Sequence, residues 1–146
     1  MTSFPDYDHY DGIGLAKLVK DGEISSLEIC EEAIRRTEKL NPKLNAIITT
    51  LYDYARDAAR HPDKDAQFGG VPFLLKDVHH AMKGFTMSSG SELLRNHVPG
   101  YDAEIVRRFK KAGLIILGKT NTPEFKLKER LSIKSIRAVM VARHNC

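Results

Sequence analysis

The hydrophobic and polar positions of the chain follow a helical period in three stretches of its first half. Apolar residues recur at helical spacing in Tyr10–Lys20, in the stretch that begins at Ser25, and in residues 51–60, so three helices are predicted. The second begins with "SSLE", in which Ser25 and Glu28 have the spacing of a capping box. We expect this helix to end at Asn41-Pro42, because proline disfavours helical backbone in the residue before it.

Short apolar runs between these stretches predict strands. The β-branched run "NAIITT" (45–50) is typical of a strand. The continuously apolar runs Val71–Leu75 and "LIIL" (114–117) are typical of strands buried on both faces. Residues 82–96, "MKGFTMSSGSELLRN", are rich in glycine and serine, and we expect them to be irregular.

Start and stop signals flank a further helix. Asp102 has the position of an N-cap for residues 103–112, and Gly113 that of the residue after the helix end. We expect "GKTN" (118–121) to form a turn, and Thr122-Pro123 to open another helix. Helices followed by strand, helix and strand predict an α/β layer with a largely parallel sheet.

Composition narrows the class of protein. The 146 residues suffice for one domain or for part of a larger one. The N-terminus lacks the basic and apolar regions of a signal peptide, and no apolar run approaches the length of a membrane span. Cys30 and Cys146 make no disulfide framework, and Cys30 is expected to be a small buried thiol. We therefore expect a cytoplasmic protein.

The net charge of +4 is concentrated at one end of the chain. Residues 126–146 carry six lysines and arginines against Glu129, whereas the rest of the chain carries a slight excess of acidic residues. The basic balance therefore gives no reason to expect nucleic-acid binding by residues 1–125.

The stretch "GLIILGKT" (113–120) matches the G-x-x-x-x-G-K-[ST] pattern of a phosphate-binding loop. In such a loop, the residues between the glycines turn their backbone N–H groups toward phosphate oxygens. Here those four residues are apolar and predict a strand. We therefore expect no nucleotide site, and no catalytic role for Lys119.

Several separate blocks resemble the amidase signature family. They are "GLAKLVKDGEISSLEICEEAIRRTEKLNPKLNAIIT", "GGVPFLLKD", "GFTMSSGSELL" and "DAEIVRRFKKAGLIILGKTNTPEF", in this order, and they cover roughly residues 10–125. The resemblance implies helices covering a mixed, largely parallel sheet, of which this chain holds an incomplete, N-terminal part. It also implies hydrolysis or transfer at carboxamides of small-molecule substrates, with no metal and no organic cofactor.

The resemblance assigns the catalytic base to Lys76. A serine hydroxyl needs a base to take its proton, and a lysine serves only when neutral, a form that burial favours. We expect Asp77 to orient the turn after the strand, and the adjacent His79 and His80 to pack locally or lie exposed, without holding a metal. Ser88, Ser89 and Ser91 fill a segment that lines the site region in the family without supplying the nucleophile.

The resemblance ends near Phe125. Family members supply the nucleophilic serine and a relaying serine, held by a cis peptide, from a later Gly/Ser-rich block that this sequence does not contain. We interpret 1–125 as the N-terminal portion of an amidase domain and 126–146 as a non-matching basic tail. The change in charge at the same point suggests truncation with a shifted reading frame. We therefore expect a truncated amidase that keeps only the catalytic lysine and is inactive alone.

Alternatives remain open. The blocks resemble both hydrolases of cyclic 6-aminohexanoate dimers and the A subunit of the tRNA-dependent amidotransferase, which works with partner subunits. A non-enzymatic remnant, or a binding module, is the third possibility. In the last case the basic tail would form a helix that binds an acidic partner or a membrane surface.

Overall fold

The computed structural model describes residues 4–124, which form a three-stranded sheet with helices on both faces. The tail 126–146 and the helix that was considered for it lie outside this range. The helix predicted to open at Thr122-Pro123 would extend beyond it. In chain order, the described helices and strands are η1 (Pro5–His9), α1 (Gly12–Asp21), α2 (Ser26–Leu44), β1 (Ile47–Thr50), α3 (Tyr52–Arg60), β2 (Pro72–Lys76), η2 (Glu92–Leu94), α4 (Glu104–Lys111) and β3 (Ile115–Thr120).

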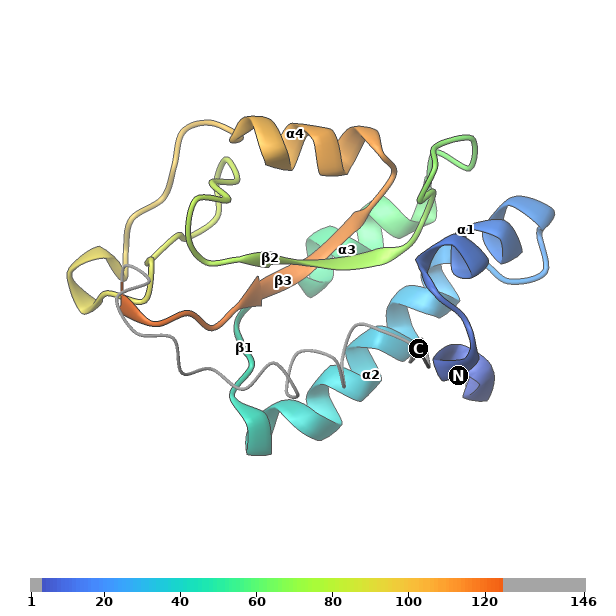
Figure 1. The fold of residues 1–146 in the computed structure, drawn as a ribbon, viewed down its shortest axis with the longest axis horizontal. Coiled ribbons are helices and arrows are strands. Elements are labelled where there is room, and N and C mark those ends of the chain that lie inside the picture. The colour runs from blue at the N-terminus through green and yellow to red at the C-terminus, as the bar shows by residue number, and fades with distance from the viewer. Residues whose placement is uncertain (1–3, 125–146) are drawn as a thin grey trace, which may run out of the picture.

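The sheet is mixed, with the order β1-β3-β2. β3 lies between the other two strands, antiparallel to β1 and parallel to β2 (Figure 1). The α/β fold class is therefore confirmed. α4 covers one face of the sheet, and α2 with α3 covers the other (Figure 1).

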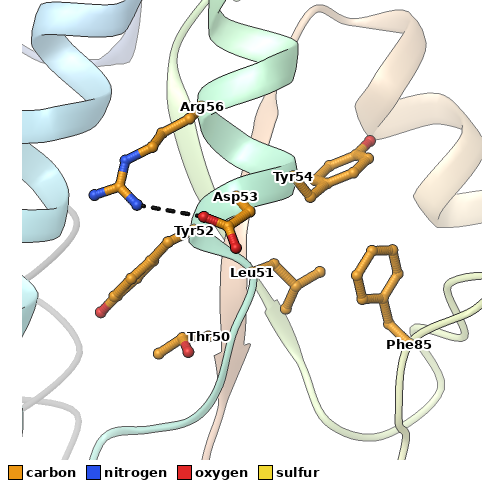
Figure 2. Close-up of a pocket in the computed structure, with 7 residues that line it drawn as sticks. All are labelled: Thr50, Leu51, Tyr52, Asp53, Tyr54, Arg56 and Phe85. Carbon is orange, nitrogen blue, oxygen red and sulfur yellow. Dashed lines mark ion pairs between the residues drawn. The ribbon is translucent and has the colours of Figure 1, made fainter.

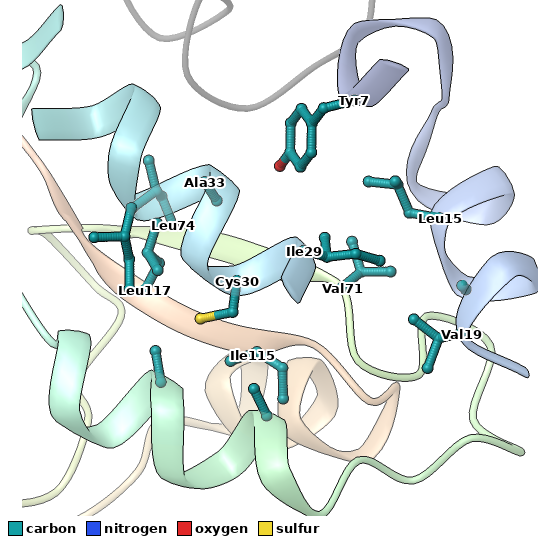
Figure 3. Packing of buried hydrophobic residues seen from close by; sticks show 14 of the residues in the cluster. Tyr7, Leu15, Val19, Ile29, Cys30, Ala33, Val71, Leu74, Ile115 and Leu117 are labelled. Carbon is teal, nitrogen blue, oxygen red and sulfur yellow. The ribbon is translucent and has the colours of Figure 1, made fainter. Parts of the chain in front are cut away.

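Two apolar clusters fill the spaces between sheet and helices. The larger joins α1, α2 and α3 to Leu74, Ile115 and Leu117 of the sheet (Figure 3). The smaller joins α4 to Leu75 and Ile116, on the opposite face. Cys30 lies fully buried in the larger cluster, where burial raises the pKa of its thiol to about 12. The predicted small buried thiol is thus confirmed.

Several local signals have the structure that the sequence predicts. Ser25 accepts a hydrogen bond from the Glu28 backbone N–H, and the Glu28 carboxylate accepts one from the Ser25 N–H, so the capping box is formed. Gly113 follows α4 with φ of +88°, and Leu114 N donates to Phe109 O at 3.2 Å, as in a Schellman end. A Cβ at Gly113 would lie 2.8 Å from Gly69 Cα, so this position also needs glycine for space.

The predicted end of α2 at Asn41-Pro42 is wrong, because the helix continues to Leu44 with Pro42 inside it. Pro42 has no N–H to donate to the carbonyl of Glu38, so the helix lacks this one hydrogen bond and ends two residues later. Asn45 then ends the helix in the left-handed conformation, with its N–H donating to Asn41 O. The Asn41 side chain bonds both N and O of Ile47 and so ties the helix end to β1.

The predicted N-cap at Asp102 is also wrong. α4 begins after Ala103, whose side chain makes no capping hydrogen bond. The Asp102 carboxylate instead accepts hydrogen bonds from Lys83 N at 2.8 Å and from Lys110 Nζ at 2.7 Å. It therefore links the irregular segment to α4.

The predicted turn at residues 118–121 is wrong as well, since β3 runs through Gly118 to Thr120. The strand contains one extra residue relative to β2: Phe73 pairs with Ile116, whereas Leu74 pairs with Gly118. Such a bulge changes the face to which the following residues point. After it, Lys119 pairs with Leu75 and therefore lies on the face covered by α4.

Candidate functional site

The candidate site lies where the parallel strands β2 and β3 end together. Lys76 is the last residue of β2 and pairs with Thr120, the last residue of β3. Ligand sites of open α/β sheets lie at such carboxyl ends. The Lys76 side chain is half-buried, and no hydrogen bond or ion pair to it is found within residues 4–124.

Asp77 follows Lys76 and turns to the opposite face of the sheet. Its side chain is 1% exposed, and its Oδ2 accepts hydrogen bonds from Ser88 N at 3.0 Å and from Ser88 Oγ at 2.5 Å. The carboxylate thus reaches a loop eleven residues further along the chain, beyond the turn that it was expected to orient. Its other oxygen, Oδ1, has no hydrogen-bond partner among the described residues.

The serine-rich segment packs between this aspartate and the chain that leaves β3. Ser91 Oγ donates to the Glu124 carboxylate at 2.8 Å. A Cβ at Gly90 would lie 2.5 Å from Thr122 O, so the two segments touch backbone to backbone. Ser89 is buried and has φ of +53°, a conformation that non-glycine residues adopt mostly where the surroundings enforce it.

The geometry brings together the blocks that carry the family resemblance. The ends of "GVPFLLKD" and "GLIILGKTNTPEF" meet side by side, and "TMSSGS" bridges them through Asp77 and Glu124. None of Ser88, Ser89 and Ser91 makes a hydrogen bond to Lys76 within the described part of the chain. Their assignment as loop serines stays a prediction.

The position of Lys119 was not predicted from the sequence. Its side chain is 0% exposed, and its Nζ donates to Thr86 O at 2.5 Å. Burial lowers the pKa of Lys119, and the nearby negative charge of Asp77 acts in the opposite direction. A lysine enclosed in this way cannot reach a phosphate in solvent, which agrees with the rejection of a nucleotide site.

The two adjacent histidines have different surroundings. His79 is exposed and has φ of +61°, whereas His80 Nδ1 lies 3.2 Å from Lys76 O and its ring lies near Phe109. Within residues 4–124 no three histidine, cysteine, aspartate or glutamate side chains are grouped closely enough to hold a metal ion.

A separate hollow of about 330 Å³ lies at the junction of β1 and α3. Its lining comes from residues 50–54 with Arg56 and Phe85, and Arg56 forms an ion pair with Asp53 across 3.6 Å (Figure 2). None of the candidate residues from the sequence lines it. Phe85 alone connects it to the loop that Lys119 holds.

Comparison with known proteins identifies the family. The family described as Amidase matches residues 28–132, which is more than half of the chain. The chain belongs to the amidase signature family. The match runs past the domain boundary predicted at 125, and that boundary stays a prediction.

Two curated relatives illustrate the range of the family. The chain is 40% identical over 117 residues to the A subunit of glutamyl-tRNA(Gln) amidotransferase from Nitrosomonas europaea, a match that covers 76% of this chain and 24% of the relative. It is 37% identical over 116 residues to "6-aminohexanoate-cyclic-dimer hydrolase" of Paenarthrobacter ureafaciens, covering 78% of this chain and 23% of the relative. The chain thus spans about a quarter of the length of these relatives.

Solved structures give the same picture. The fold matches 6-aminohexanoate cyclic dimer hydrolase complexed with substrate at a TM-score of 0.76 and 36% identity, over 82% of this chain and 25% of that one. It matches native peptide amidase from Stenotrophomonas maltophilia at a TM-score of 0.75 and 32% identity, over 84% and 26%. No described helix has the length and apolarity needed to cross a membrane.

Proposed function

We propose that this chain forms the first quarter of an amide-hydrolysing domain and supplies its catalytic base, Lys76. The position of Lys76 is the observation that carries the proposal. The residue ends a buried strand at the carboxyl edge of the sheet, next to Asp77, which holds the serine-rich loop. No described residue forms a hydrogen bond or an ion pair with its ammonium group. A base must be available to a reacting hydroxyl, and a lysine engaged in an ion pair would not be.

The chemistry would follow the family. A neutral Lys76 would take the proton of a serine hydroxyl through a second serine, while the first attacks the carbonyl carbon of an amide. The acyl-enzyme would form as the amine leaves, and water would then release the acid. Both serines would come from outside the described residues. Enclosure of the strand end by the remainder of a domain would favour the neutral lysine.

The substrate class is a carboxamide in either branch of the family. The identities to the cyclic-dimer hydrolase and to the amidotransferase chain, 37% and 40%, are too similar to separate the branches. A small linear or cyclic amide would need no other protein. Membership of the amidotransferase branch would require partner subunits.

A polypeptide of these 146 residues alone contains the base but no Gly/Ser-rich block, so we expect it to release no amine or ammonia from simple amides. The purified chain, assayed against linear and cyclic amides with Lys76→Ala as the paired variant, tests this. Hydrolysis that disappears in Lys76→Ala would overturn the expectation of inactivity. Hydrolysis that persists in Lys76→Ala would overturn the role of Lys76 as the base.

The competing interpretation is that the chain is a remnant that does not fold into a functional domain. A thermal melt followed by circular dichroism distinguishes the two interpretations. The continuous buried cores on both faces of the sheet favour a cooperative transition. A gradual loss of signal without a transition would favour the remnant.

A further inference from the structure

Two fully buried charges of opposite sign lie on the α4 face of the sheet. Asp77 is 1% exposed and Lys119 is 0% exposed, and no role in proton transfer is proposed for either. Charged side chains are seldom fully buried, because removal from water is costly unless other groups compensate for it. Such a pair therefore calls for an explanation.

The two side chains hold one short segment of the loop. Lys119 Nζ donates to the carbonyl of Thr86, and Asp77 Oδ2 accepts from the N–H and the hydroxyl of Ser88. The cation thus binds a backbone acceptor and the anion binds a backbone donor two residues later. These hydrogen bonds involve ionised partners and are stronger than those between neutral groups.

The strand geometry is what places Lys119 there. Without the extra residue of β3 between Ile116 and Gly118, strand alternation would turn Lys119 into the apolar cluster under α2. With the bulge, Lys119 lies beside Leu75, and Asp77 continues the same face of the neighbouring strand. The Asp77 N–H also donates to Thr120 O, and this hydrogen bond fixes the backbone of Asp77 at the end of β3.

We propose that Asp77 and Lys119 are positioning residues that act as a pair and fasten the loop 86–91 to the strand end from which Lys76 projects. The relevance of this anchoring to catalysis rests on the proposed function, in which Lys76 is the base. Burial lowers the pKa of Lys119, the negative charge of Asp77 opposes this effect, and Asp77 Oδ1 has no hydrogen-bond partner among the described residues. We therefore expect each charge to lower the free-energy cost of burying the other.

Amide hydrogen exchange in the full chain tests this without any need for catalysis. The near-isosteric substitutions Asp77→Asn and Lys119→Met each remove one charge and leave the other buried. We expect the exchange rate of the Ser88 amide to rise at least tenfold in each single variant. In the double variant we expect a rise at least tenfold smaller than the product of the single effects. The Ser88 amide should exchange more slowly in Lys119→Arg, which keeps the charge, than in Lys119→Met.

Lys110→Met is the matched control, since it removes the partly exposed partner of Asp102 and leaves the loop anchors intact. Ser88 exchange within twofold of wild type in Lys119→Met, or single effects that simply multiply in the double variant, would overturn the proposal. If a single variant does not fold, thermal melts of the single and double variants test the proposal instead. A double variant that regains a cooperative transition supports the pair, and one no better than the worse single variant refutes it.

Discussion

Gly118→Ala tests the course of β3 most sharply. A Cβ at this position would lie 2.6 Å from Thr49 O, 3.3 Å from Ile47 Cγ2 and 3.5 Å from Leu74 Cδ2. The closest atom belongs to the backbone of β1, so no side-chain rotation relieves the contact. β1 must instead move away from β3 at the bulge that orients Lys119.

Adding a methyl group to a tightly packed site costs about 1–3 kcal/mol. Replacing glycine by alanine reduces the entropy of the unfolded chain and recovers about 0.4–1 kcal/mol where the backbone is unstrained. We therefore expect a net loss of about 1–2 kcal/mol in the free energy of unfolding. For a chain of this size, that loss lowers the melting temperature by roughly 4–8 °C.

The assay is urea and thermal unfolding followed by circular dichroism. Gly100→Ala is the control, because no atom lies within 4 Å of its Cβ position. We expect the control to change stability by less than about 0.5 kcal/mol. Gly118→Ala that unfolds like wild type would refute the strand assignment and restore the turn at 118–121 that the sequence suggested.

Two further predictions concern groups in the α2 layer. The Glu32 carboxylate is 3% exposed, and hydrogen bonds from Arg35 and then Arg36 hold its pKa below the usual range. We expect Glu32→Gln to lose about 2 kcal/mol at pH 7. Since the pKa of Glu32 is depressed in the folded state, the full difference in stability between wild type and variant should be present above about pH 5, and it should vanish as the pH falls through the folded pKa. Urea midpoints at several pH values measure this difference, and a pH-independent difference would contradict the prediction. Glu104→Gln, which removes an exposed carboxylate of α4, is the control and should leave the urea midpoint close to that of the wild type. The buried Cys30 thiol, with its pKa raised to about 12, should react with an aromatic disulfide reagent at pH 8 only when Cys146→Ser protein is unfolded by urea; rapid reaction in the native state would show that the α2 core is open.

Local signals with one physical meaning were readable from the sequence. The capping box at Ser25, the glycine after α4 and the apolar run of β2 each act within a few residues, so their structure follows from their own chemistry. Lys76 was likewise placed correctly at a strand end, because the run before it is continuously apolar.

The errors arise where distant segments decide the outcome. Asp102 has N-cap chemistry, but its carboxylate accepts hydrogen bonds from Lys83 N and Lys110 Nζ instead of capping the helix. Gly118 looks like a turn residue, but it is needed because the backbone of β1 approaches closely. The apolar run itself does not reveal the bulge, and Gly118, which could have indicated one, was interpreted as a turn residue. The burial of Lys119 and its contact with the serine-rich loop were therefore missed.

The central claim is that Lys76 acts as a base in a complete amidase domain. The most direct test replaces the corresponding quarter of the Paenarthrobacter cyclic-dimer hydrolase with residues 1–124 and measures ring opening of a cyclic amide as released primary amine. We predict activity that falls at least a thousandfold in Lys76→Ala and stays within twofold in Lys17→Ala, which removes an exposed lysine of α1. An active hybrid that retains its rate in Lys76→Ala would contradict the account.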